Sequence, residues 1–286
     1  MRLLKYGRNL AIGWLAYSSP LVAYGACLGD QNAKIPLKVY IVPQLTATQI
    51  YTGWAPLLAQ VGVRTTQCFE INVPSTIPEF ESDLNDGKPD FAYMNPYHAV
   101  MKWRDHQYIP LIASSIPIFG VLSIRRDSKV SHVHELSGGK LAFPAPNAFA
   151  ASLLIRATLS LAGVTYEPVY LKTHSNVYRA VIRGDVEAGG GIQSTLMSEP
   201  GELRAELRAL METKRYTAHP FSANARVPIV IQKQIQDAFL AIGETPEGQK
   251  LLKGAQLADP VVVTLKNNYK PLEELQLEKF VVRNAN

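Results

Sequence analysis

The sequence predicts an α/β protein made of two similar lobes. Short apolar runs typical of buried strands alternate with amphipathic helix patterns along most of the chain. This alternation begins near residue 37 and restarts near residue 140, so the two halves share one rhythm. A chain of 286 residues is long enough for two domains with substantial apolar cores. Strand–helix alternation of this kind also favours mostly parallel sheets.

In the first half, apolar runs between turn residues predict strands at 37–42, 67–73, 90–94, 108–114 and 119–125. Apolar residues that recur every three or four positions predict helices at 46–61, at 78–85 and from Asn95-Pro96 onward. Pro43 and Gln44 end the first strand, and Asp86-Gly87 ends the second helix.

In the second half, the same criteria predict strands at 140–143, 169–172, 185–188 and 207–215. They predict helices at 147–162, 175–183, 228–242, 246–252 and 271–280. The chain is expected to cross between the lobes twice, near 115–124 and near 207–217. We therefore expect residues 33–116 with 216–286 to form one lobe and residues 117–215 to form the other.

The first 26 residues have the form of a secretory signal peptide. Arg2, Lys5 and Arg8 precede an apolar stretch at 10–28 that contains small residues near its end. A retained membrane anchor is the other interpretation. However, Ser18-Ser-Pro20 interrupts the stretch and leaves it short of about 18 clean apolar residues. We expect residues 1–26 to be removed and the protein to reside in the periplasm.

Charge and hydropathy exclude several classes of protein. The chain has 29 Lys and Arg against 24 Asp and Glu, a net charge of +5. Without the leader 26 cations face 24 acids, and no basic run typical of nucleic-acid binding remains. A mean hydropathy of −0.01 with one long apolar stretch excludes a polytopic membrane protein. We expect a monomer that binds no nucleic acid.

Cys27 and Cys68 are the two cysteines of the chain. Cys27 follows Gly25-Ala26, which is half of a lipoprotein signal, although Tyr24 is unusual in such signals. Lipidation of Cys27, a Cys27–Cys68 disulfide in an oxidising compartment and two free thiols are the alternatives. Because the spacing fits no metal motif, we expect neither a metal nor another cofactor.

Polar residues of the kind that cap helices follow four of the predicted strands. They are Gln44-Leu-Thr46, Asn95-Pro-Tyr97, Pro146-Asn-Ala148 and Thr173-His-Ser-Asn176. In open α/β sheets, ligands bind beyond the carboxyl ends of strands, where helix N-termini offer unpaired N–H groups. Several helix starts facing one cleft would bind a small anion. Ordinary capping, which every α/β protein needs, is the alternative.

Four segments carry more specific motifs: Asp90-Phe-Ala-Tyr-Met-Asn-Pro-Tyr-His98, Leu141-Ala-Phe-Pro-Ala-Pro-Asn147, Thr173-His-Ser-Asn176 and Gly184-Asp-Val-Glu-Ala-Gly189. In their order and spacing they resemble the phosphate-, phosphite- and phosphonate-type periplasmic solute-binding proteins of ABC transporters. The resemblance runs from about residue 37 to residue 256. It implies the type II periplasmic-binding fold, in which two α/β lobes joined by two hinge strands enclose a ligand cleft. Such proteins bind and release a solute and catalyse nothing.

The resemblance also implies roles for individual residues. His174 matches a histidine that contacts the ligand head group, and Asn147 begins the helix that holds the phosphonate oxygens. Thr76 falls where such proteins can carry an aromatic contact residue. Asn95 falls in a loop where they place a tyrosine. The expected ligand contacts are Gln44, Thr46, Thr76, Tyr93, Asn95, Tyr97, Asn147, Ala148, Phe149, His174, Ser175 and Asn176.

One segment departs from the family pattern. After Asn147 the phosphonate binders have a Ser-Thr-Ser run, whereas this chain has Ala148-Phe149-Ala150. Backbone N–H groups remain, but three hydroxyl donors are missing, and an unmatched buried acceptor costs about 1–3 kcal/mol. The binding role is therefore better supported than the phosphonate ligand. A larger or less charged ligand that stacks on Phe149 or Tyr97 is a further hypothesis.

Several other residues are expected to be structural. We expect His98 to pack inside the protein and His132 and His134 to lie in an exposed turn. Gly189-Gly-Gly191 lacks the spacing of a phosphate-binding loop and is expected to form a turn near the cleft or hinge. Arg226 is a candidate cation of the cleft, since guanidinium groups bind anions with two donors.

Three functions compete. Delivery of a small anionic solute to an ABC permease, by lobes that close on the solute, is favoured. A sensory binding protein that reports to a membrane kinase or cyclase is the second, and the altered 148–150 segment is the reason to consider it. An enzyme on the same fold is disfavoured by the leader and by the lack of a recognisable nucleophile motif. Neighbouring permease or signalling genes would distinguish the first two.

Overall fold

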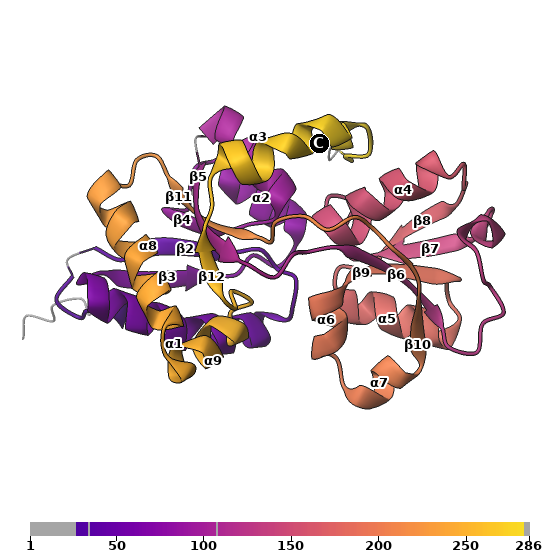
Figure 1. The fold of residues 1–286 in the computed structure, drawn as a ribbon, viewed down its shortest axis with the longest axis horizontal. Coiled ribbons are helices and arrows are strands. Elements are labelled where there is room, and N and C mark those ends of the chain that lie inside the picture. Colours follow the sequence, from indigo (N-terminus) through magenta and orange to yellow (C-terminus); the bar gives the residue numbers. More distant parts are fainter. Residues whose placement is uncertain (1–26, 34, 107, 283–286) are drawn as a thin grey trace, which may run out of the picture.

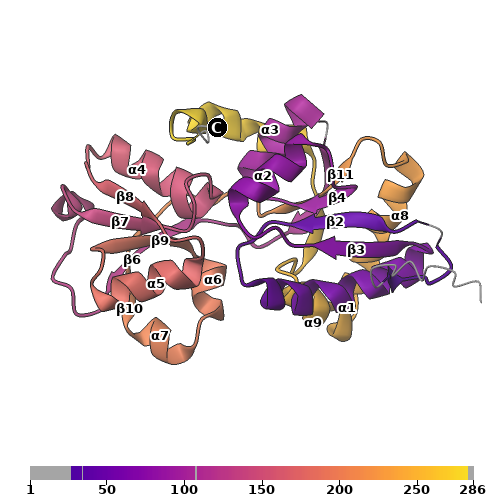
Figure 2. The same cartoon turned by 180° about the vertical axis from the view of Figure 1, so that it is seen from behind.

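A computed structural model describes residues 27–33, 35–106 and 108–282, without the side chains of residues 103–106. Two sheets lie side by side, each with helices packed against it (Figures 1 and 2). We call the first sheet with its helices lobe 1 and the second with its helices lobe 2. The predicted two-lobed α/β fold is confirmed. The predicted signal peptide lies outside the described residues. Among the described residues, no helix has the length and apolarity to cross a membrane.

In the described part of the chain, lobe 1 contains a seven-stranded sheet in the order β1-β3-β2-β4-β11-β5-β12. Its strands are β1 (Leu28–Gly29), β2 (Leu37–Ile41), β3 (Cys68–Asn72), β4 (Phe91–Tyr93), β5 (Tyr108–Ser114), β11 (Pro220–Asn224) and β12 (Pro260–Val262). Lobe 2 contains a five-stranded sheet in the order β10-β6-β9-β7-β8. Its strands are β6 (Gly120–Arg125), β7 (Lys140–Phe143), β8 (Glu167–Tyr170), β9 (Ala188–Ile192) and β10 (Leu207–Glu212).

The prediction of mostly parallel sheets is wrong. Parallel pairing is confined to β3-β2-β4 in lobe 1 and β8-β7-β9 in lobe 2. The other described strands pair antiparallel, including β11 between β4 and β5 and β6 beside β9. The reason lies in the connectivity. Strands β6 and β11 are each reached directly from the other lobe, without a helix between. Parallel neighbours joined in sequence need a helical crossover, whereas β6 and β11 can pair antiparallel without one.

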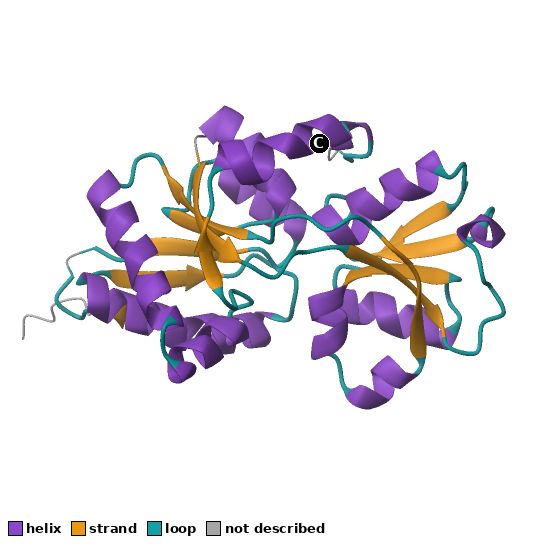
Figure 3. Cartoon of the chain, viewed as in Figure 1, coloured by secondary structure: helices purple, strands orange, loops and turns teal. Residues whose placement is uncertain are grey.

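The helices cover the faces of both sheets (Figure 3). Lobe 1 carries α1 (Ala47–Thr65), α2 (Ile77–Asn85), α3 (Pro96–His106), α8 (Ile229–Gly243), α9 (Pro246–Gly254), η3 (Leu265–Tyr269), η4 (Lys270–Leu275) and η5 (Leu277–Lys279). Lobe 2 carries η1 (Val133–Leu136), η2 (Phe149–Leu154), α4 (Ile155–Leu161), α5 (His174–Arg183), α6 (Gln193–Ser198) and α7 (Gly201–Ala205). Strands β1, β11 and β12 and helices α6 and α7 were not predicted.

Two segments carry the chain between the lobes, one from Ser114 to Gly120 and one from Glu212 to Pro220. The segments are bonded to each other through Ile118 and Tyr216, whose backbone N–H groups each donate to the other's carbonyl at 2.8 and 2.9 Å. The lobes are therefore joined by a short double connection, which passes from one sheet to the other in Figure 1.

Gly189, Gly190 and Gly191 form the middle of strand β9, so the prediction of a turn there is wrong. They are glycines because two helices pack directly on the strand. A Cβ at Gly191 would lie 2.1 Å from the Tyr178 hydroxyl of α5, and one at Gly190 would lie 2.2 Å from the Ala151 carbonyl of η2. The close packing brings the N-terminal turns of both helices to the end of β9.

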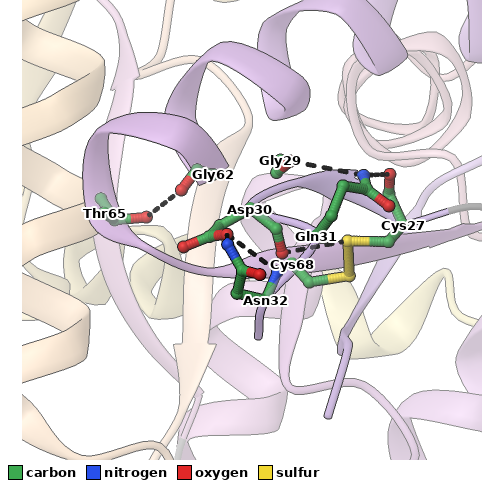
Figure 4. The surroundings of a disulfide bond; sticks show 8 residues. All are labelled: Cys27, Gly29, Asp30, Gln31, Asn32, Gly62, Thr65 and Cys68. Carbon is green, nitrogen blue, oxygen red and sulfur yellow. Dashed lines mark hydrogen bonds between the residues drawn. A yellow bond between two sulfur atoms is a disulfide. The ribbon is translucent and has the colours of Figure 1, made fainter. Parts of the chain in front are cut away.

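A disulfide joins Cys27 and Cys68 and ties β1 to the first residue of β3 (Figure 4). The pair is separated by 41 residues. In the chain-entropy description, closing a loop of that length stabilises the fold by about 4 kcal/mol. The bond also consumes the Cys27 sulfur, which a lipid anchor would require.

Candidate functional site

Two adjoining cavities lie between the lobes. The larger has a volume of about 700 Å³ and borders both crossing segments. The smaller has a volume of about 20 Å³, which is room for about one water molecule. Gln44, Ile192 and His219 line both cavities, so the two form one continuous cleft. We call the small cavity the shut end and the large cavity the open end.

The shut end gathers helix starts from both lobes. Asn95 precedes α3 of lobe 1, where its Oδ1 accepts a hydrogen bond from the His98 backbone at 2.8 Å. Thr173 caps α5 of lobe 2 by accepting from the Asn176 backbone at 3.2 Å. Helix η2 begins at Phe149, and the first N–H groups of a helix have no partner within it. These starts give the shut end a positive electrostatic character without a charged side chain.

His174 is the best-defined polar side chain of the shut end and is 3% exposed. Its Nδ1 lies 3.1 Å from the Thr195 hydroxyl, which also lies 2.9 Å from the Ile192 carbonyl and 3.0 Å from the Tyr178 hydroxyl. Nδ1 is therefore occupied inside lobe 2, and Nε2 is the ring nitrogen for which no hydrogen bond is found among the described residues. Burial lowers the pKa of His174 to about 4, so the ring is neutral at pH 7.

His219 is the second imidazole of the shut end and also lines the open end. Its ring stacks on Tyr93 with centroids 5.4 Å apart. Burial, followed by repulsion from His98 and His174, lowers the pKa of His219 to about 3. Both imidazoles of the shut end are therefore uncharged at neutral pH.

Asn147 fastens the two lobes together beside the shut end. Its Nδ2 donates to Glu81 of α2 at 3.1 Å, and its main-chain oxygen accepts from Asn95 at 3.4 Å. Its side chain also pairs with both backbone groups of Val282, at 3.0 and 3.1 Å. The C-terminal segment that carries Val282 reaches from lobe 1 toward lobe 2 in both views (Figures 1 and 2).

Hydrogen bonds from His98 and Asn147 keep the Glu81 side chain an ionised carboxylate. His98 Nε2 lies 2.8 Å from one carboxylate oxygen, and Asn147 donates to the other. Burial by itself would raise the pKa of Glu81, but these hydrogen bonds outweigh it and keep the pKa below its usual value. The prediction that His98 packs inside the protein is confirmed, since it is 2% exposed.

The open end has a different lining. Its back is the crossing segment Ile116–Phe119, and its walls include Met197 of α6 and Lys253 of α9. Arg215 lies with its guanidinium carbon 4.2 Å from the centre of the Phe119 ring. Of the described residues that line either cavity, Arg215 and Lys253 are the ones with a permanent charge, and none is an aspartate or glutamate.

The structure brings half of the predicted contact residues to the cleft: Gln44, Tyr93, Asn95, Ala148, Phe149 and His174. The others do not line it: Thr46, Thr76, Tyr97, Asn147, Ser175 and Asn176. Thr46 and Thr76 cap α1 and α2. Ser175 bonds to Glu199, and Asn176 donates to the Leu171 carbonyl.

Sequence reasoning missed His219, Arg215 and Lys253, which no local motif marks. It also nominated Arg226, which lies instead on lobe 1 and donates to Asp90 at 2.9 Å and to the Lys88 carbonyl at 3.0 Å. An Asp-rich turn before a strand could have predicted that partner. His132 precedes helix η1 and His134 lies within it, and both side chains are exposed, as expected.

Comparison with known proteins connects this cleft to a family. Residues 39–269, more than half of the chain, match the family described as "ABC transporter, phosphonate, periplasmic substrate-binding protein". A binding protein component of an ABC phosphonate transporter from Pseudomonas aeruginosa shares the fold, with a TM-score of 0.75 at 14% identity over 88% of this chain and 90% of that one.

Two further structures share the fold. PhnD1 from Prochlorococcus marinus, solved with methylphosphonate, has a TM-score of 0.77 at 13% identity over 85% of this chain and 97% of that one. XAC2383 from Xanthomonas citri, bound to chloride, has a TM-score of 0.72 at 16% identity over 86% and 99% of the two chains. The resemblance inferred from the four sequence motifs is confirmed. The chain belongs to the periplasmic substrate-binding proteins of phosphonate ABC transporters.

Proposed function

We propose that this solute-binding protein takes a small organophosphorus anion into the cleft between its lobes and delivers it to an ABC permease. The observation that carries the proposal is the shut end, where helix starts from both lobes meet and none of the described residues that line the wall has a carboxylate. A ligand that touches both lobes favours the closed arrangement, and this is how such a protein signals occupancy to its permease.

The head group of the ligand is proposed to lie between His174 and the first turn of η2. The N–H groups of Phe149 and Ala150 replace the hydroxyl donors that other phosphonate binders have in this segment. An oxyanion beside the buried ring favours the protonated form of His174, which donates from Nε2. The head group needs the lobes further apart at the shut end than described, both to enter and to stay, since the shut end has room for about one water molecule.

The moving parts are proposed to be residues 33–116 with 216–286 and residues 117–215. The boundaries fall in the two crossing segments, which bond to each other through Ile118 and Tyr216. Closure about these segments would bring Asn147 to Glu81, the contact present in the structure. A sensory role is the second candidate, and the apolar 148–150 segment is the reason to keep it.

The protein is proposed to be periplasmic, without a lipid anchor, and monomeric. Membership of a periplasmic family supports the location. The disulfide supports the absence of a lipid, because a thioether to lipid would need the same Cys27 sulfur. Intact mass spectrometry of protein purified from the periplasm should show a gain of about two daltons on reduction. An acyl mass, or no change on reduction, would refute the bridge.

A thermal-shift screen tests the proposed solute. The panel contains phosphate, phosphite, methylphosphonate, propylphosphonate, sulfate, simple carboxylates and small amines. A ligand at 100 times its dissociation constant should stabilise the protein by about 2.7 kcal/mol, a shift of a few degrees at this size. Stabilisation by phosphorus oxyanions supports the proposal. Stabilisation by another class alone would discard the organophosphorus ligand, and no stabilisation would favour the sensory role.

A further inference from the structure

The open end is larger than a methylphosphonate needs. Its volume of about 700 Å³ falls within the range of sites for much larger organic ligands. The lobes already touch at Asn147, so separation of the lobes does not account for this space. The back of the open end is the crossing segment Ile116–Phe119, next to the pivot, where rotation of the lobes changes distances least. Rotation of the lobes should therefore change the open end less than it changes the shut end.

The charges of the open end favour one kind of ligand terminus. Lys253 projects from α9 and has no ion pair with a described residue, so its charge is fully available. Arg215 shares its charge with Glu212 at 3.3 Å and covers the face of Phe119. No aspartate or glutamate among the described lining residues could neutralise an ammonium group. This end of the cleft should attract an anion and repel a cation.

The polar groups beside these cations suit a carboxylate. Gln193, Ser194 and Gln256 line the same cavity and can donate hydrogen bonds. Ser114 and Ser198 line it too, but their hydroxyls already donate to the Ala258 and Ser194 carbonyls. Phe119, Ile116 and Met197 supply apolar surface for the carbon chain between the two ends of a ligand. The open end thus combines an apolar wall, neutral donors and two cations.

We propose that the solute is a phosphonate with a second anionic end, a phosphonocarboxylate, whose carboxylate lies in the open end near Lys253 and Arg215. This inference rests on the proposed function, because the phosphonate head is placed at the shut end. It assigns Lys253 and Arg215 the task of selecting acidic over amino-terminated phosphonates.

Three ligands of one length test the proposal: 3-phosphonopropionate, propylphosphonate and 2-aminoethylphosphonate. They differ only in the group at the far end, which is a carboxylate, a methyl or an ammonium. Calorimetric titration of protein purified from the periplasm should give the order carboxylate, methyl, ammonium, with each step roughly three- to tenfold in dissociation constant. The same order is expected for 4-phosphonobutyrate, butylphosphonate and 3-aminopropylphosphonate, which are one carbon longer.

Two variants locate the effect. Lys253→Gln should weaken binding of the phosphonocarboxylate more than binding of the alkylphosphonate. The dissociation constant of the alkylphosphonate divided by that of the phosphonocarboxylate should therefore fall by roughly threefold or more. Arg215→Gln should reduce it less, because Glu212 already neutralises part of that charge. Lys250→Gln is the matched control, because Lys250 lies on the same helix, is exposed and does not line the cleft. It should leave both dissociation constants unchanged.

The outcomes distinguish failure of the phosphonocarboxylate proposal from failure of the proposed phosphonate-binding function. If alkylphosphonates bind but the terminal group makes no difference at either length, or the ammonium is preferred, the phosphonocarboxylate is ruled out while the phosphonate function stands. An equal effect of Lys250→Gln and Lys253→Gln would also overturn it, because a general charge effect would then explain the selectivity. If none of the six phosphonates binds, the proposed function itself fails.

Discussion

The two ends of the cleft lie between the same two lobes, yet they are built on opposite principles. The shut end is lined by apolar side chains, the amides of Gln44 and Asn95 and two neutral imidazoles, and its positive character comes from helix starts. The open end is wide and has two permanent cations. Burying an unpaired charge costs much more free energy than burying an oriented dipole, whereas a solvated site can hold a charge at little cost. The degree of burial therefore determines whether each end attracts an anion with dipoles or with charged side chains.

The comparison predicts that acid destabilises the protein through the shut end. Unfolded histidine has a pKa near 6.5, whereas burial lowers the pKa of His174 to about 4 and that of His219 to about 3. Between these values the unfolded chain binds protons that the folded protein cannot. The stability is therefore complete above pH 6.5 and falls as the pH drops toward 4, by roughly 2 kcal/mol per histidine at pH 5.

Urea unfolding at pH 7 and pH 5 measures this loss. His174→Gln should remove about half of the difference between the two pH values. His134→Gln should remove none of it, because His134 is exposed. An unchanged pH dependence in His174→Gln would mean that His174 is not a neutral buried residue in solution.

Removal of the imidazole tests the shut end as the head-group site. His174→Ala should weaken propylphosphonate binding roughly tenfold to a hundredfold, because a buried oxyanion loses a hydrogen-bond partner worth about 1–3 kcal/mol. The protein should still fold, as circular dichroism would show. His134→Ala serves as the control. Equal affinities of His174→Ala and the wild type would remove His174 from the site.

The neutral ring of His174 predicts a proton taken up on binding. Burial lowers the pKa of the free ring to about 4, and an oxyanion placed beside the ring favours its protonated form and so raises that pKa. Affinity should rise as the pH falls from 7 toward 5. Calorimetry at pH 6 in two buffers of different ionisation enthalpy should show up to about one more proton bound by the wild type than by His174→Gln. Identical proton uptake by the two proteins would show that His174 stays neutral in the complex.

The smallest effect is expected at the contact that closes the shut end. Asn147→Ala removes the side-chain bonds to Glu81 and Val282 and should loosen the lobes by about 1–2 kcal/mol. Solution X-ray scattering of the free protein should give a larger radius of gyration than the wild type. Asn267→Ala, in the C-terminal segment but with an exposed side chain, should not change it. An unchanged radius in both variants would show that Asn147 does not hold the lobes together.

Local features of the fold could be predicted from the sequence, and pairing partners could not. The strand at 108–114 was predicted to the residue because its apolar run is long and is bounded clearly. Strand β11 was missed because Pro220 to Asn224 is short and contains serine and asparagine, and its burial comes from neighbours on both sides. Three successive glycines suggest a turn because glycine is conformationally permissive, whereas the glycines of β9 make room for Tyr178 and η2.

The residues of the candidate site also differ in how well the sequence predicts them. Asn95, Ala148, Phe149 and His174 were predicted because each follows a strand at a helix start, a pattern that is visible in sequence. Lys253 and Arg215 come from a helix and a crossing segment that only the tertiary fold brings to the cleft. The sequence therefore predicted the shut end in outline and the open end hardly at all.

A crystal structure of the propylphosphonate complex tests the central claim most directly. The account predicts the phosphorus atom at the shut end, with its oxygens within hydrogen-bond distance of His174 Nε2 and of the N–H groups of Phe149 and Ala150, and the propyl chain pointing to the open end. A phosphonate seated beside Lys253 and Arg215, with the shut end unchanged, would contradict it. In that case the cations would hold the head group, and the division of work between the two ends would be reversed.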